Sequence, residues 1–245
     1  MKKFFALASF ILILMTSCSG DDDASNNDTV LLKKIVVTSD DGFSNIFRYD
    51  YDGNRLTKIT VGDEEETYLS INYTYSTDKL IKMERNEDGE VTARTIFAYD
   101  TQGKLASTTT TIYDVWESSD YVQKTEFTYN TNGGVSFELF SGTGNNLELD
   151  GNGSYQFENG NIVSYTVFNS ENTYTFDTKN SPTKNTFAID VINLELRQGG
   201  PNNILSYTGD GEPYTYTYTY NDADYPVKAE QNIGGSVYTT QYYYE

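Results

Sequence analysis

The residue types on which most enzymes depend are scarce in this sequence. Its 245 residues include no histidine and a single cysteine, Cys18, so Ser-His-Asp catalysis, Cys-His catalysis and histidine-ligated zinc are excluded. The 36 acidic residues leave glycoside hydrolysis open, because that reaction needs only two carboxylates about 5 to 10 Å apart. No stretch, however, pairs an acid with the tryptophan-walled cleft of a glycosidase. We therefore expect no enzyme, no catalytic residues and no cofactor.

One acidic segment has the residue spacing of a calcium-binding loop. Asp50, Asp52 and Asn54 alternate with other residues in "DYDGN". An EF-hand loop would next require a glycine and later a closing glutamate, and Arg55 and Val61 stand at those positions. The Asp-Gly pair is instead typical of a tight turn, so we expect no metal site.

A stripe of tyrosines is the most distinctive group of side chains. In "YTYTYTY", strand periodicity places Tyr214, Tyr216, Tyr218 and Tyr220 on one face. If that face is exposed, sugar rings could stack on it as a ligand. If it faces the concave interior, it belongs to the core, with hydroxyls that reach water or backbone groups. The core interpretation is favoured, because four exposed tyrosines would form a large apolar patch.

The N-terminal segment predicts where the protein resides. Lys2 and Lys3 precede an apolar run, Phe4 to Met15, which has the length of a signal-peptide core and is shorter than a membrane-spanning helix. The residues just before Cys18 resemble the lipobox of bacterial lipoprotein signal peptides. That resemblance implies a signal peptide at residues 1–17 and lipidation of Cys18, which would anchor the protein to the membrane. The alternative is an ordinary secretory signal with a chance cysteine.

The aspartates behind the cysteine suggest surface exposure. The stretch "SGDDD", with Asp21, Asp22 and Asp23, resembles the acidic export signal of surface-exposed lipoproteins of Bacteroidota. The alternative is a merely polar linker. Residues 18–29 are poor in apolar side chains, so we expect a flexible tether that follows the lipidated cysteine.

Charge excludes one class of partner. The formal net charge is −19, and removal of Lys2 and Lys3 with the leader lowers it to −21. A surface of this sign repels nucleic acid and anionic lipid headgroups. We expect no nucleic-acid partner.

A degenerate repeat predicts the architecture. Each copy has two aromatics that flank one residue, then a polar turn, and usually an aliphatic residue further on. The second aromatics are Tyr51, Tyr75, Tyr99, Tyr129, Phe157, Phe176 and Tyr220. Each copy is typical of a β-hairpin, with Asp52-Gly53, Asn132-Gly133 and Asn159-Gly160 at turns that need positive φ.

These hairpins predict an all-β fold for residues 30–245, a length suited to a single domain. We expect an antiparallel up-and-down meander of some 14 to 17 strands. A sheet this wide cannot stay flat, because its strands twist. It should form a strongly curved sheet or a partial barrel.

One segment does not fit the hairpin pattern. Residues 180–203 contain two prolines and a Gly-Gly pair, with an apolar run between them. We interpret this segment as a long loop with a short helix that plugs the concave face.

The repeat "YDYDGNRLTKI" resembles the tyrosine–aspartate (YD) repeats of large bacterial surface proteins. The combination of a lipobox, these hairpins, "YTYTYTYNDADYPVKAE" and the final "YTTQYYYE" resembles a family of Bacteroidota outer-membrane lipoproteins of unknown function. The resemblance covers roughly residues 30 to 245. It implies a porin-like β-sheet fold and an outer-membrane location. It says nothing about a ligand.

Two functions from different classes remain. The first is a surface-exposed outer-membrane lipoprotein that acts as a structural or interaction module, with an outer-membrane protein as a partner. The alternative is a module that binds a glycan or another polymer through concave-face tyrosines. The first is favoured, because nothing in the sequence singles out a ligand.

Overall fold

The computed structural model describes residues 29–113 and 120–245. Cys18, Asp21, Asp22 and Asp23 lie outside these ranges, so lipidation and surface export stay predictions.

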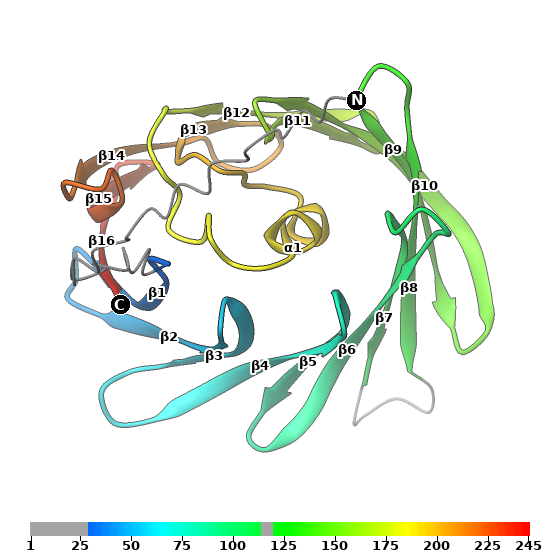
Figure 1. The fold of residues 1–245 in the computed structure, drawn as a ribbon, viewed down its shortest axis with the longest axis horizontal. Coiled ribbons are helices and arrows are strands. Elements are labelled where there is room, and N and C mark those ends of the chain that lie inside the picture. Colours follow the sequence, from blue (N-terminus) through cyan, green and yellow to red (C-terminus); the bar gives the residue numbers. More distant parts are fainter. Residues whose placement is uncertain (1–28, 114–119) are drawn as a thin grey trace, which may run out of the picture.

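The described residues form sixteen antiparallel strands that close into a barrel (Figure 1). The strands are β1 (Leu32–Ser39), β2 (Ser44–Asp52), β3 (Arg55–Gly62), β4 (Thr67–Ser76), β5 (Lys79–Glu87), β6 (Glu90–Tyr99), β7 (Leu105–Ile112), β8 (Tyr121–Tyr129), β9 (Val135–Thr143), β10 (Asn146–Glu158), β11 (Asn161–Val167), β12 (Ser170–Phe176), β13 (Ile204–Thr208), β14 (Tyr214–Tyr220), β15 (Pro226–Ile233) and β16 (Ser236–Tyr244). Every strand pairs with its neighbours in sequence, and β1 pairs with β16. The predicted meander is confirmed, and its curvature continues to full closure.

The hairpin turns have the backbone that their glycines predict. Gly53 and Gly133 have φ of 60° and 88°, in the left-handed region that glycine adopts without a Cβ clash. Asn159 and Gly160 are both positive, at 50° and 82°, as a two-residue type I′ turn requires. The positive φ of Gly53 therefore supports the interpretation of "DYDGN" as a turn.

The repeat corresponds to a contact between consecutive hairpins. A tyrosine hydroxyl donates to the carbonyl of a buried leucine just after the preceding turn, and the basic residue before that leucine covers the tyrosine ring. Two such contacts are Tyr75 to Leu56 O at 3.0 Å with Arg55 over the ring, and Tyr99 to Leu80 O at 2.7 Å with Lys79 over the ring. Lys104 covers Tyr129 in the same way, with Nζ 4.8 Å from the ring centroid.

The segment between β12 and β13 lies inside the barrel, as Figure 1 shows. We call residues 177–203 the plug. It contains the helix α1 (Ile189–Leu196), whose Val191, Ile192 and Leu194 are buried against the inner wall. The plug is fastened to the wall by backbone hydrogen bonds, such as Phe187 N to Asn54 O at 2.8 Å. The predicted loop with a short helix in the concave face is confirmed.

The two faces of the wall differ in chemistry. The buried inner face is rich in leucine, phenylalanine and tyrosine. The outer face alternates with it and carries polar, charged and apolar side chains. Register pairings define one outer belt of Thr74, Lys82, Ile96, Thr109, Lys124, Phe140 and Leu149. A second belt consists of Ser44, Thr38, Thr239, Glu230 and Thr217.

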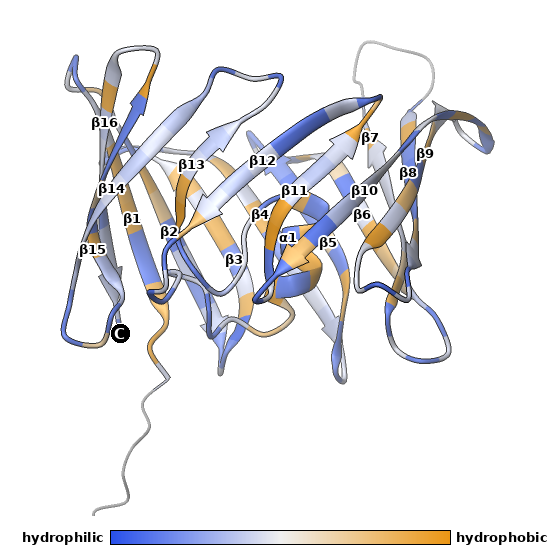
Figure 2. Cartoon of the chain, turned by 90° about the horizontal axis from the view of Figure 1, so that it is seen from above, coloured by the Kyte–Doolittle hydropathy of each residue, from blue (hydrophilic) through white to orange (hydrophobic). Residues whose placement is uncertain are grey.

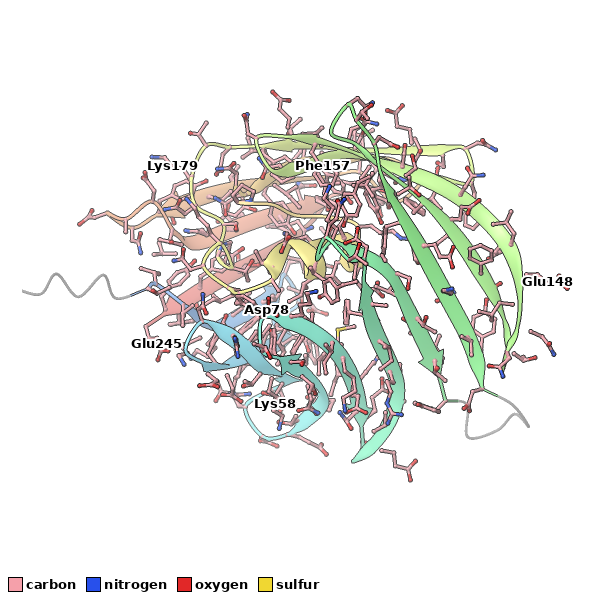
Figure 3. All side chains as sticks on the ribbon, turned by 45° about the vertical axis from the view of Figure 1, so that its right-hand side comes forward. Lys58, Asp78, Glu148, Phe157, Lys179 and Glu245 are labelled. Atoms are coloured by element: carbon pink, nitrogen blue, oxygen red, sulfur yellow. The ribbon has the colours of Figure 1, made fainter. Side chains whose placement is uncertain are left out.

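Ion pairs lie on this outer face. Glu84 accepts from Lys82 at 2.7 Å and from Arg94 at 2.8 Å. Figure 3 shows another basic side chain, Lys58, at the outside of the wall. Figure 2 shows hydrophilic and neutral colours along most strands, with apolar segments interspersed. Leu149 is one of several exposed apolar residues of the wall.

Candidate functional site

The tyrosine stripe lies on the inner face of β14. Tyr214, Tyr216, Tyr218 and Tyr220 are half-buried, while the threonines between them are exposed. The register places Tyr218 opposite Ala229, which is almost completely buried. The core interpretation of the stripe is confirmed.

The stripe helps to hold the plug. The Tyr220 hydroxyl donates to the carboxylate of Asp177 in the plug, and the Tyr218 hydroxyl donates to the carbonyl oxygen of Ile204, the first residue of β13, at 2.9 Å. The rings of Tyr216 and Tyr218 stack with centroids 5.6 Å apart, so each covers part of its neighbour's face. Ligand stacking on the stripe stays a prediction.

A cavity of about 210 Å³ separates the C-terminal end of α1 from strands β7 to β10. We call it the α1 cavity. Its wall side presents the hydroxyls of Thr108, Thr110 and Ser141 and the amide of Gln123. Strand periodicity brings these polar side chains to the inner face, because they alternate with outward residues along each strand. The result is a polar section in an otherwise apolar and tyrosine-rich interior.

Glu195 is the acidic group on the plug side of the α1 cavity. Burial raises the pKa of this carboxyl above its ordinary value of 4.5, and hydrogen bonds from Thr108 and Thr110 and the charge of Arg197 oppose that shift. Among the described residues, no lysine or arginine forms a salt bridge with it. A largely buried carboxylate without an ion-pair partner is costly.

Arg197 follows the last turn of α1 and also lines the α1 cavity. Its backbone φ is 58°, in the left-handed region that is usually occupied by glycine at this position of a helix. Its guanidinium carbon lies 5.7 Å from the ring centroid of Phe137, within the range of a cation–π contact. The backbone therefore carries strain of about 1 to 2 kcal/mol at a residue whose side chain faces the cavity.

An aromatic side chain borders the α1 cavity near the β11–β12 turn. Phe168 lies over Gly151 of β10, where an added Cβ would stand only 2.2 Å from the ring. Gly153 makes similar room for the ring of Phe137. Two glycines on the inner face of one strand thus allow two aromatic rings to lie directly on the wall.

Sequence reasoning did not single out Glu195 or Arg197. Both belong to the segment 180–203, which the sequence marks only as an exception to the hairpin pattern. A usable signal was present, because the run "INLELR" places two charges inside an apolar stretch that is expected to plug a concave face. Buried charge of that kind is a recognised indicator of function.

Within residues 29–113 and 120–245, no group of three acidic, cysteine or histidine side chains is arranged to hold a metal ion. No helix in this part of the chain has the length and apolar character needed to cross a membrane.

Comparison with known proteins gives structural likenesses, among them two porin-like proteins. No protein-family model matches the sequence, and no curated protein matches it. A porin-like protein from Bacteroides uniformis shares 12% identity and a TM-score of 0.54, over 87% of this chain and 98% of that chain. A porin-like protein from Bacteroides vulgatus shares 14% identity and a TM-score of 0.55, over 88% of this chain and 99% of that chain. At such low identity the likeness concerns the fold, and this chain has a porin-like β-barrel fold.

Proposed function

We propose that this protein is an outer-membrane lipoprotein that displays its barrel at the cell surface as a structural or interaction module, without catalytic activity. The outer face of the wall carries the proposal. A barrel that sits in lipid needs a continuous outward band of apolar residues. Here the outer belts include Lys82, Lys124 and Glu230.

The energetic cost of placing this wall in lipid is large. A lysine or arginine on the lipid face costs about 2–4 kcal/mol near the bilayer midplane, and charged side chains recur on several strands. The barrel therefore stands in water and needs a separate attachment to the membrane. The lipid predicted on Cys18 supplies that attachment, and Asp21, Asp22 and Asp23 supply the export signal.

The test is fractionation of cells that express the full chain or its Cys18→Ala variant. The wild-type protein should remain with the membranes after a carbonate wash, and the variant should be released. Retention of Cys18→Ala would mean that the barrel itself is inserted or that another group anchors it. Antibody labelling of intact cells then tests export, since replacement of the three aspartates by alanine should remove the surface signal.

A second candidate function is glycan binding, and one observation favours it. The barrel interior combines aromatic rings with a polar cavity, as the α1 cavity shows. Glycan binding in the interior does not depend on the lipid anchor. A lipid-anchored interaction module could therefore also bind a glycan.

A further inference from the structure

We propose that the α1 cavity binds one neutral sugar ring, held by Glu195, Arg197 and Gln123. The inference deepens the glycan-binding candidate by naming its site and its ligand class. The proposed sugar site therefore lies next to β7–β10 and not at the tyrosine stripe.

The two charged groups on the plug side of the cavity, Glu195 and Arg197, have no ion-pair partner among the described residues. Structural buried charges, in contrast, are normally paired with each other. Both lie beside the barrel wall: Glu195 is near the hydroxyls of Thr108 and Thr110, and the guanidinium carbon of Arg197 is 5.7 Å from the ring centroid of Phe137. Two charged groups beside one cavity are an arrangement typical of a binding site.

The charges around the cavity balance. On the plug side of the cavity, the positive charge of Arg197 is matched by the negative charge of Glu195, so a ligand without net charge fits best. The remaining polar groups are hydroxyls and the Gln123 amide, which both donate and accept hydrogen bonds. Sugar hydroxyls also do both, and neighbouring hydroxyls match the two oxygens of a carboxylate and the forked donors of a guanidinium.

Size and shape agree with a single ring. Drug-sized ligands occupy pockets of about 300–1,000 Å³, and this cavity measures about 210 Å³. Phe127, Tyr155 and Phe168 line it with apolar surface, which suits the carbon-bound hydrogens of a sugar. The cavity extends toward the rim that carries the β11–β12 turn, where Phe168 lies. Strand alternation places this rim opposite the one at which Leu31 pairs with Glu245.

The structure offers two variants that should keep the fold. Glu195→Gln retains the shape of the side chain, removes a poorly solvated charge and replaces one accepting oxygen by a donating amide nitrogen. Arg197→Gly removes the guanidinium and places glycine at a left-handed position that favours it. The matched control is Glu230→Gln, which removes an outer-wall carboxylate paired with Lys228.

The experiment titrates glucose, galactose, mannose and N-acetylglucosamine into the full chain by calorimetry and by ligand-observed NMR. At least one sugar should bind saturably, with a Kd of about 1 mM or tighter. Both cavity variants should weaken that binding by tenfold or more while thermal melts show an intact fold, and Glu230→Gln should bind as wild type does.

Three results would overturn the proposal. The first is no saturable binding of any of these sugars, and the second is equal binding by the cavity variants. The third is tighter binding of glycine or alanine than of sugars, which would identify a site for zwitterions. Released Cys18→Ala protein should bind the same sugar, so failure of the sugar site and failure of the lipid anchor are distinguishable.

Discussion

Glu195 occupies a position where stability and ligand binding favour different residues. Its carboxyl is largely buried, so the folded protein holds its proton more tightly than the unfolded chain does. A glutamate in this situation lowers the stability of the fold once the pH exceeds its ordinary pKa of 4.5. Retention of such a residue is expected where it serves function rather than stability.

The first prediction follows from the lower stability that the ionised Glu195 carboxylate gives to the fold. At neutral pH, Glu195→Gln should melt at a higher temperature than the wild-type protein, because the variant has no buried carboxylate to ionise. As the pH falls through 4.5, the wild-type carboxyl becomes protonated in both states and the difference should disappear. Thermal melts at a series of pH values check this result. A difference that stays constant with pH would show that packing, and not ionisation, distinguishes the two proteins.

At the scale of the element, the contact between a tyrosine and the preceding hairpin explains why the sequence motif repeats. Tyr75 and Tyr99 each donate a phenol hydrogen bond back to the strand that follows the preceding turn, so neighbouring hairpins are joined near the same rim. The basic residue in "GNRLTKI", "TDKLIKM" and "QGKLAST" covers the ring from outside, while the following leucine is buried in the core. The spacing of the repeat is therefore the spacing of hairpin-to-hairpin contacts.

A second prediction concerns this contact. Tyr99→Phe removes the hydroxyl that donates to Leu80 O and keeps the ring under Lys79. The loss should be about 0.5–1.5 kcal/mol, the usual net contribution of one hydrogen bond. Urea denaturation measures it. Tyr243→Phe is the control, because its hydroxyl contacts Gln241 on the exposed outer wall, and it should cost less. Equal losses in the two variants would contradict a special role for the repeat tyrosine.

The strands and turns can be predicted from the sequence because they depend on residues close to one another along the chain. Alternating aromatics and turn glycines specify hairpins, and strand twist makes a sheet of sixteen strands curve. Closure depends on something that no local pattern contains, namely the register between Leu32 and Tyr244 at the two ends of the domain. The partial barrel of the sequence analysis is therefore a full barrel in the structure.

The site was less predictable than the elements for a related reason. The inward direction of Tyr214–Tyr220 follows from alternation and was favoured. The approach of Glu195 to Thr108 and Thr110 joins the plug to strands far away in the sequence. Hydrophobic pattern cannot specify which part of a wall a plug meets, because that depends on the packing of the closed barrel.

At the scale of the whole molecule, the many inward tyrosines predict behaviour in alkali. Burial raises the pKa of Tyr99 and Tyr214 from 10.0 to about 12 and raises the pKa of several other inward tyrosines as well. The folded barrel therefore favours neutral phenols more than the unfolded chain does. This stability is fully present below pH 10 and is lost as the pH rises through the folded pKa values.

The third prediction is a cooperative alkaline transition. The inward tyrosines should ionise only well above the ordinary pKa of 10.0, and their tyrosinate absorbance should rise together with loss of the β-sheet circular dichroism. The two signals, recorded on the same sample, check this expectation. Complete ionisation near pH 10 with intact dichroism would show that the inner face is open to solvent.

The even number of strands has a consequence for orientation. In an up-and-down barrel the strand count fixes whether the chain enters and leaves at the same rim, and here Leu31 and Glu245 exchange backbone hydrogen bonds at one rim. With a lipid on Cys18, that rim faces the membrane, and a domain fused after Glu245 would be held close to the bilayer. The opposite hairpin tips, including Phe168 beside the α1 cavity, point away from it. Circular permutation between β15 and β16 would place the tether at the rim of those tips. That rim, and not the one with Leu31 and Glu245, would then face the membrane.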